Sequence, residues 1–346
     1  MPKVSVIVPM YNAAAHVRAA LDSILTGTYR DIEVIAVDDG SFDDTVKIVS
    51  AIGDSRLRLV ANPRNQGISP VLNQAWELAE GEYLVRMDAD DIARPERIAK
   101  LVDCLDARPE IAVCGSQIQR FGAETSVSNY PQQDAEIRAM SLFYCVLAHP
   151  TVAIRRAPFD AYGLRFRAQF RCAQDYDLWT RAMALGLRFG NLPDVLLDYR
   201  VSPGSVTSQG GEVLKREDRE IKDPYIAHCF PDAGPEDRRL FADLVALQMP
   251  ATRATMLRLC MTVGRLAAQA RLAPSSFSTG TFTTLLAQYW TIAADSFVTR
   301  GLCSRSDIEA VALADQAFGR FLQDSGPVLK QVNSRFADLG ELVLAA

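Results

Sequence analysis

The feature of this sequence that most constrains its fold is a regular alternation of apolar runs and helical patterns along its first third. Short apolar runs are typical of buried strands, and apolar residues at helical spacing indicate helices between them. The expected strands are 4–9, 32–37, 57–61, 83–87 and 111–119, and the expected helices are 14–25, 45–52, 68–79 and one opened by Pro95. Because strands that alternate with helices of this length form mostly parallel sheets covered on both faces, we expect a Rossmann-like α/β fold.

Three polar segments follow expected strands of this sheet. PMYN (9–12) follows the first strand, VDDGSFDDT (37–45) ends the second, and MDADD (87–91) follows the fourth. In open parallel sheets, ligands bind beyond the carboxyl ends of the strands. We therefore expect these three segments to contribute to one binding site.

Between residues 122 and 201 the alternation weakens. Residues 145–154 and 195–201 are expected to form strands, and the sequence QDYDLWTRAMAL, from Gln174, a helix. Capping this helix would by itself be a sufficient role for Asp175, whereas Asp177 is expected to be only a charge in its first turn.

Beyond the polar stretch 202–211, long helical patterns replace the strand patterns. Residues on one helical face, and further helical patterns, occur at 256–270, 282–298, 306–322 and 328–344. We therefore expect an α/β domain at 1–210, with halves 1–121 and 122–210, followed by an all-helical domain at 211–346.

Composition excludes several classes of protein. With 346 residues, 49% of them hydrophobic, the chain can bury the cores of about two domains. A net charge of −5 gives no basic surplus for nucleic acid. The seven cysteines include no CxxC pair, which favours reduced thiols and a cytoplasmic location. The N-terminal apolar run is too short for a signal peptide, and no run is long enough to span a membrane.

The Asp-rich segment after the fourth strand has few explanations. A phosphatase of the haloacid type would carry its nucleophilic Asp after the first strand, and an EF-hand would need ligands and a Gly that this segment lacks. The Gly-rich loops of Rossmann oxidoreductases and of pyrophosphorylases are absent after the first strand. Two interpretations stay open: the carboxylates cap the helix opened by Pro95, or they help to hold Mg²⁺ or Mn²⁺ with water and a diphosphate.

Four segments together resemble glycosyltransferase family 2. They are VSVIVPMYNAAAHVRAALDSIL (4–25), EVIAVDDGSFDDT (33–45), NPRNQGISPVLNQAWELAEGEYLVRMDADDIARPERI (62–98) and QDYDLWTRA (174–182). The resemblance covers residues 3–205. It implies an inverting nucleotide-sugar transferase of the GT-A fold, with the helical domain after it.

The resemblance assigns Pro9, Tyr11 and Asn12 to the nucleotide pocket, with Tyr11 against the base. An aromatic face on a nucleobase contributes about 1–3 kcal/mol. Asp39 would accept from a ring N–H of the base, which favours uracil-like or guanine-like donors, although a helix N-terminal charge would also explain it. Arg64 would face the nucleotide or its phosphates, with a solvated surface charge as the alternative.

The same resemblance assigns Asp88 to the ribose hydroxyls and Asp90 to a metal ion that bridges the phosphates. Ala89 belongs to the same binding segment. His149 would lie near the donor phosphates or the metal, although a lone His is more often structural.

On the acceptor side, the resemblance makes Asp175 the general base. The family more often has Glu at the position of Gln174, so one hydrogen bond or charge differs here. Asp91 would either support the neighbouring binding residues without touching the ligand or lie on the acceptor side. Trp179 is the remaining acceptor-side candidate, with core packing its simpler role.

The implied reaction is transfer of a sugar from a nucleotide-diphosphate donor, with UDP-sugars favoured, to a glycan, lipid-linked or protein acceptor. It implies Mn²⁺ or Mg²⁺ as cofactor, a non-processive action, and a role in cell-surface polysaccharide or glycoconjugate synthesis. A non-catalytic nucleotide-sugar binding or scaffold protein is the alternative. The donor sugar, the acceptor and the oligomeric state stay open at this point.

The segment 251–300 is basic in an otherwise acidic chain. It carries five arginines against Asp295 alone, a net charge of +4. A basic amphipathic surface suits peripheral contact with the anionic inner face of a membrane. Packing of the helices on one another, with the arginines outward, is the simpler interpretation.

Overall fold

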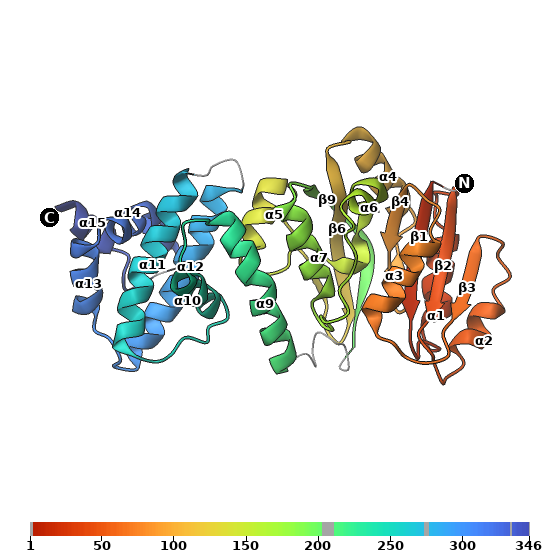
Figure 1. Ribbon diagram of the computed structural model, residues 1–346, viewed down its shortest axis with the longest axis horizontal. Helices are drawn as coiled ribbons and strands as arrows, with labels where there is room; N and C mark the ends of the chain where they lie inside the picture. The colour runs from red at the N-terminus through yellow and green to blue at the C-terminus, as the bar shows by residue number, and fades with distance from the viewer. Residues whose placement is uncertain (1–2, 203–210, 273–276, 333, 346) are drawn as a thin grey trace. The chain divides into compact units, whose positions relative to one another are not determined.

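A computed structural model describes residues 3–202, 211–272, 277–332 and 334–345. The chain divides into two compact units (Figure 1). Unit 1 comprises Met1–Ile137 and Cys145–Glu217, and unit 2 comprises Arg138–Tyr144 and Asp218–Ala346. Each unit is described separately below.

Unit 1 is built on a nine-stranded, mostly parallel sheet, as expected. The strand order is β3-β2-β1-β4-β8-β6-β9-β5, and β7 pairs with β6. The strands are β1 (Val4–Met10), β2 (Ile32–Asp38), β3 (Leu57–Ala61), β4 (Tyr83–Arg86), β5 (Ile92–Ala93), β6 (Ile111–Gly122), β7 (Ser126–Val127), β8 (Ala153–Arg155) and β9 (Arg188–Val201). Strands β1 to β4 run parallel to one another, whereas β8 is antiparallel to both β4 and β6. The α/β class is therefore confirmed.

Helices cover this sheet. Strand β1 is buried along its whole length, and because successive side chains point to opposite faces, both faces of the sheet must be covered there. Helix α3 packs on β1 and β2, and α4 on β6. The helices of unit 1 are α1 (Val17–Leu25), α2 (Thr45–Ser50), α3 (Ile68–Leu78), α4 (Arg97–Ala107), α5 (Asp134–Met140, which continues into unit 2), α6 (Arg156–Ala161) and α7 (Gln174–Ala184).

The strand expected at 145–154 is wrong for most of its length. Only β8 is a strand, and the preceding residues form a 3₁₀ turn, His149–Thr151. Pro150 cannot donate to a strand ladder, and its carbonyl instead accepts from the buried guanidinium of Arg97 at 2.7 Å.

Unit 2 is helical in the part that the structure describes. Its helices are α10 (Pro235–Val245), α11 (Arg253–Leu272), α12 (Thr279–Thr299), α13 (Arg305–Ala314), α14 (Gln316–Gln331) and α15 (Leu339–Ala345). Helix α9 (Gly211–Cys229) begins in unit 1 and passes into unit 2 after Glu217. The single helix expected at 306–322 is two helices, because Asp315 is extended and its carboxylate caps α14 through the N–H of Phe318.

The arginines of the basic segment 251–300 are largely paired within unit 2. Four of them pair with acids from other elements: Arg253 with Asp307, Arg258 with Glu236, Arg265 with Asp237 and Arg271 with Asp324. Because acids from other elements neutralise these arginines, the surface of the segment is less basic than its net charge of +4 suggests. The structure therefore favours the interpretation in which the helices pack on one another with the arginines outward. Within the described ranges, no helix combines the length and the apolar character that a membrane crossing requires.

Helices α11 and α14 approach closely because Gly264 has no side chain. A Cβ at this position would lie 2.5 Å from the backbone nitrogen of Phe318, and a backbone atom cannot rotate away. Gly264→Ala should therefore force the two helices apart and cost about 1–3 kcal/mol, seen as a lower midpoint of thermal unfolding.

Gly280→Ala in α12 is the matched control, because a Cβ there would have no heavy atom within 4 Å. It should leave the midpoint unchanged or raise it slightly, since Ala favours helix more than Gly by about 1 kcal/mol. Equal midpoints for the two variants would contradict the close packing.

Candidate active site at the carboxyl edge of the sheet

The carboxyl ends of β1, β2 and β4 bring the first predicted site residues to one edge of the sheet. Strands β1 and β2 are paired in register up to Met10 and Asp38, so Tyr11 and Asp39 leave the sheet side by side. Strand β4, parallel to β1, ends at Arg86, just before the Asp-rich segment. Pro9 is a buried residue of β1 itself.

An aromatic pair lies beyond β1. Tyr11 is 48% exposed and Phe42 is 83% exposed, with ring centroids 6.2 Å apart and planes nearly perpendicular. Asn12 joins the two segments, because its N–H donates to the Ser41 hydroxyl and its Oδ1 accepts from the N–H of Phe42 at 3.1 Å. Sequence reasoning missed Phe42, although an aromatic residue inside a polar Asp-rich segment was a visible signal.

Asp39 is buried and organises the loop before α3. Its Oδ1 accepts from the N–H of Gln66 at 2.8 Å, and its Oδ2 from the N–H of Gly67 at 2.9 Å. Each carboxylate oxygen can accept a further hydrogen bond. Arg64, in the same loop, is exposed, and its backbone packs against Gly40, whose φ of +73° favours glycine.

Two buried arginines lie beneath the Asp-rich segment. Arg86, on β4, donates from both Nη atoms to the two oxygens of Asp88, one of them at 2.6 Å. Arg97, on α4, is fully buried and donates to the carbonyls of Arg86 at 2.5 Å and Pro150 at 2.7 Å. Sequence reasoning missed both, although an arginine inside the apolar run YLVRM was a signal for Arg86.

The next carboxylates are crowded. Burial and the negative charge of Asp88 raise the pKa of Asp90, and the same two causes raise that of Asp91 to about 8. Among the residues that the structure describes, no side chain forms a hydrogen bond with the Asp90 carboxylate. Ala89, which lies in the chain between β4 and β5, is buried.

Of the two roles expected for Asp91, the structure favours support of its neighbours over contact with an acceptor. Its side chain is fully buried, and Oδ1 accepts from the N–H of Arg200 at 2.8 Å. Arg200 also donates from Nε to the carbonyl of Asp90 at 3.0 Å. The physical role of Asp91 is therefore to tie the end of β9 to the Asp-rich segment.

Asp175 lies in the first turn of α7. The N-cap of this helix is Ala173, so Gln174 and Asp175 are its first two residues and Asp175 is not the cap. Burial raises the pKa of Asp175 to about 6, against smaller opposing effects that include the charge of Arg86. Oε1 of Gln174 is buried without a hydrogen-bonding partner among the described residues.

Two other acceptor-side or metal candidates lie in the core. Trp179 is 1% exposed and packs edge-on against Phe159, Phe189 and His149, so it presents no open face to a sugar. The buried imidazole of His149 has a pKa well below its usual value because of burial and the charge of Arg86. Its Nε2 has no partner among the described residues, and the ring of Phe166 lies 5.4 Å from the imidazole ring, centroid to centroid.

The carboxylates of the Asp-rich segment are compatible with a divalent cation that takes most of its ligands from water and phosphate. The described residues contain no group of three or more His, Cys, Asp or Glu side chains arranged to hold a metal. Burial and, second to it, the negative charge of Asp88 raise the pKa values of Asp90 and Asp91, so three carboxyl groups are close together here. A cation would offset that charge, with Asp90 as its protein ligand and the rest of its shell from water and phosphate oxygens.

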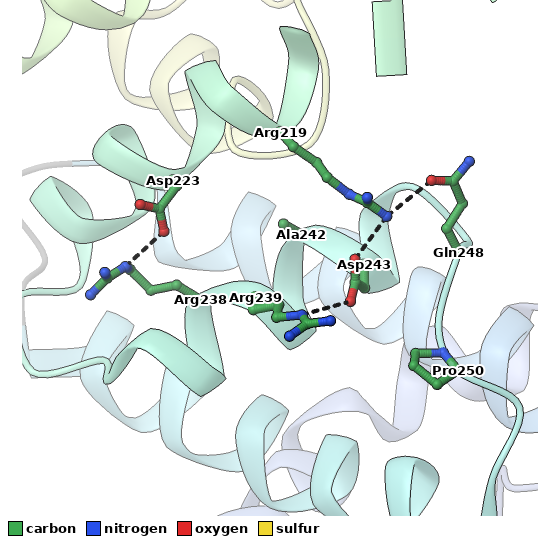
Figure 2. A pocket seen from close by; sticks show the side chains of 8 residues that line it. All are labelled: Arg219, Asp223, Arg238, Arg239, Ala242, Asp243, Gln248 and Pro250. Carbon is green, nitrogen blue, oxygen red and sulfur yellow. Dashed lines mark hydrogen bonds and ion pairs between the residues drawn. The ribbon is translucent and has the colours of Figure 1, made fainter. Parts of the chain in front are cut away.

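A separate hollow of about 430 Å³ lies in unit 2 and shares no residue with this edge (Figure 2). It is lined by polar side chains of α9 and α10. Asp243 pairs with Arg219 at 2.9 Å and Arg239 at 3.8 Å, and Asp223 pairs with Arg238. Because acids already pair with its arginines, we do not regard it as the active site.

Comparisons with known proteins identify the family of the chain. The family described as Glycosyl transferase family 2 matches residues 5–163. An uncharacterized glycosyltransferase of Haemophilus influenzae is 30% identical over 246 residues, 67% of this chain and 76% of that protein. The UDP-Glc:alpha-D-GlcNAc-diphosphoundecaprenol beta-1,3-glucosyltransferase WfaP of Escherichia coli is 29% identical over 223 residues, 64% of this chain and 86% of that protein.

Solved structures share the fold. TarS 1–349 of S. aureus, in complex with UDP-GlcNAc, superposes with a TM-score of 0.56 at 18% identity, over 98% of this chain and 90% of that chain. The chain belongs to glycosyltransferase family 2. It is a glycosyltransferase with a GT-A type fold.

Two substitutions in the Asp-rich segment should have opposite effects on the stability of the fold. Asp88→Asn should leave Arg86 buried without its counter-charge and cost about 3 kcal/mol. Asp91→Asn should be nearly neutral at pH 5, where the raised pKa keeps Asp91 protonated.

The effect of Asp91→Asn on the free energy of unfolding depends on pH. The folded pKa of Asp91 is raised, so its contribution to stability is lost as the pH rises from about 4 to 8. Asp91→Asn avoids that loss and should gain stability relative to wild type between pH 5 and pH 8. Thermal unfolding at the two pH values measures both effects, and a relative loss at pH 8 would contradict the assignment.

Proposed function

We propose that this enzyme transfers a sugar, with inversion, from a nucleotide-diphosphate donor to an acceptor hydroxyl. The observation that carries the proposal is the placement of Asp175: a carboxyl with a pKa near 6 lies within the electrostatic reach of Arg86 and Asp88 at the donor edge. The UDP-Glc donor of WfaP and the UDP-GlcNAc bound to TarS support a UDP-sugar donor. WfaP also supports a lipid-linked acceptor. A role in polysaccharide synthesis is supported by the succinoglycan biosynthesis protein ExoO of Rhizobium meliloti, which is 30% identical over 219 residues.

On the donor side, we assign the nucleobase of the donor to the aromatic face of Tyr11, with Phe42 beside that ring. The remaining lone pairs of Asp39 are suited to a ring N–H of uracil. Asp88 would accept from the ribose hydroxyls while Arg86 holds it in place. The exposed Arg64 is suited to the nucleotide phosphates.

Asp90 would hold the metal ion, Mn²⁺ or Mg²⁺. When bound there, the ion would offset negative charge on the departing diphosphate. We assign the catalytic domain to residues 1–210, with the donor half at 1–121 and the acceptor half at 122–210.

The reaction would be a single displacement. Asp175 accepts the proton of the acceptor hydroxyl while that oxygen forms a bond to the anomeric carbon. The bond from this carbon to the diphosphate breaks, and its electron pair leaves with the nucleoside diphosphate. Because attack and departure occur on opposite sides of the carbon, the configuration inverts.

Asp175→Asn should lower turnover by about 10²- to 10⁴-fold, which is the usual contribution of a general base. UDP affinity should stay near the wild-type value, because the donor contacts lie in other segments. Steady-state turnover and UDP binding, measured on the same variant, check this. Normal turnover would remove the base from Asp175.

The pH profile of the wild-type enzyme provides an independent check. The base acts when deprotonated, and its pKa is about 6, so turnover should fall below pH 6 and level off above it. A limb near pH 4 instead would indicate a carboxyl with an unshifted pKa.

Asp90→Asn should remove the metal-dependent part of donor affinity and, with it, transfer. UDP-sugar binding with and without Mn²⁺ measures the first effect, and release of UDP measures the second. Transfer that persists in excess chelator would contradict the role of Asp90. Release of UDP that requires an acceptor would exclude a protein that only binds nucleotide sugars.

A further inference from the structure

A carboxylate outside the assigned catalytic segments forms hydrogen bonds with residues 171–173, which lead into α7. Glu217, on α9, is 2% exposed, and burial of a charge without partners is costly. In the described part of the chain, its partners are backbone N–H groups and not a cation. Oε1 accepts from Arg171 at 2.8 Å, and Oε2 accepts from Cys172 at 2.9 Å and Ala173 at 3.1 Å.

Three successive N–H groups around one carboxylate form a concave site for negative charge. Here that site is filled by the protein itself. Ala173 is the N-cap of α7, and its methyl side chain cannot accept a hydrogen bond. A carboxylate at this end of an 11-residue helix is also favoured by the helix dipole.

The peptide of Ala173 is fixed from both sides. Its N–H donates to Glu217, and its carbonyl accepts the first helical hydrogen bond, from Asp177 at 3.0 Å. Asp175 lies only two residues further on, in the first turn. The direction in which α7 begins, and with it the position of the Asp175 carboxylate, therefore depends on Glu217.

We infer that Glu217 is a positioning residue for the base, an inference that rests on the proposed function of Asp175. It lies beyond residue 210, in the helix that continues into unit 2. The chain after the catalytic segments thus supplies a group that the active site needs. Glu217 touches no reacting atom and acts through the backbone of residues 171–173.

The test is Glu217→Gln in the full chain. Gln keeps the size of the side chain but loses the charge, and its amide NH₂ would face the backbone N–H groups. A misplacement of about 1 Å can cost about 10²-fold in rate, so turnover should fall about 10- to 100-fold. UDP affinity with Mn²⁺ should stay at the wild-type value, because the donor segments are untouched.

Glu212→Gln is the matched control on the same helix. Glu212 is exposed and pairs with Lys215 at 2.7 Å, and such surface pairs contribute little. Its turnover should equal that of wild type. If Glu217→Gln does not fold, Glu217→Asp, which keeps the charge and shortens the reach, should show a smaller loss of turnover.

A double-mutant cycle separates positioning from a general structural role. In an Asp175→Asn background, Glu217→Gln should cost little further turnover, because the base that it positions is already absent. The same loss in both backgrounds would overturn the inference. The inference would also be overturned if the Glu217→Gln variant, measured below its unfolding midpoint, turned over as fast as the wild-type enzyme.

Hydrogen exchange gives a readout that needs no activity. The amides of residues 171–173 should be protected in wild type and in Glu212→Gln, and should exchange faster in Glu217→Gln. Unchanged exchange would overturn the inference. A wild-type enzyme that transfers no sugar would instead contradict the proposed function, and exchange would still decide whether Glu217 holds this segment.

Discussion

The edge of the sheet that carries the candidate active site depends on how the buried guanidinium of Arg86 is neutralised. Burial of an isolated charge is costly, and the two-point contact with Asp88 compensates that cost on β4. Arg97 then fixes the backbone of Arg86 and of Pro150 from beneath. These two arginines link the donor strand, the 3₁₀ turn and α4, so the Asp-rich segment has one defined position.

The surplus of carboxylates above these arginines has a physical consequence. Asp90, which is half-buried, and Asp91, which is fully buried, both have raised pKa values because of burial and the charge of Asp88. Asp91 contributes its oxygen to the N–H of Arg200, which fastens the end of β9 to the same segment. Asp90 keeps its carboxylate available, which is the property that a ligand of a cation on the diphosphate would need.

Carboxylates also organise the loops on both sides of the site. Asp39 accepts from two N–H groups before α3, and Glu217 accepts from three before α7. Irregular backbone near an active site has N–H groups without ladder partners, and a buried acceptor satisfies several of them at once. The segments before α3 and before α7 are thus both held by a buried carboxylate, each from a different part of the chain.

The sequence by itself determined the α/β class and the edge of the sheet at which the candidate site residues gather. Strand and helix periods are local properties, so β3 was predicted to the residue, and the parallel sheet brings Tyr11, Asp39 and Asp90 to one edge whatever their neighbours are. The strand predicted at 145–154 was wrong because Pro150 cannot donate a hydrogen bond to a strand ladder. An apolar run of this kind also occurs in a buried turn.

Only the tertiary structure decided the surroundings of each side chain. Trp179 and Asp91 are buried, and the pKa of Asp175 is raised, because of residues distant in sequence. Glu217 reaches a backbone 44 residues away, and nothing in the local pattern of a polar helix distinguishes that carboxylate from its exposed neighbours. Burial, ionisation and long-range hydrogen bonds are properties of packed neighbours, and a linear pattern specifies those neighbours only through the fold.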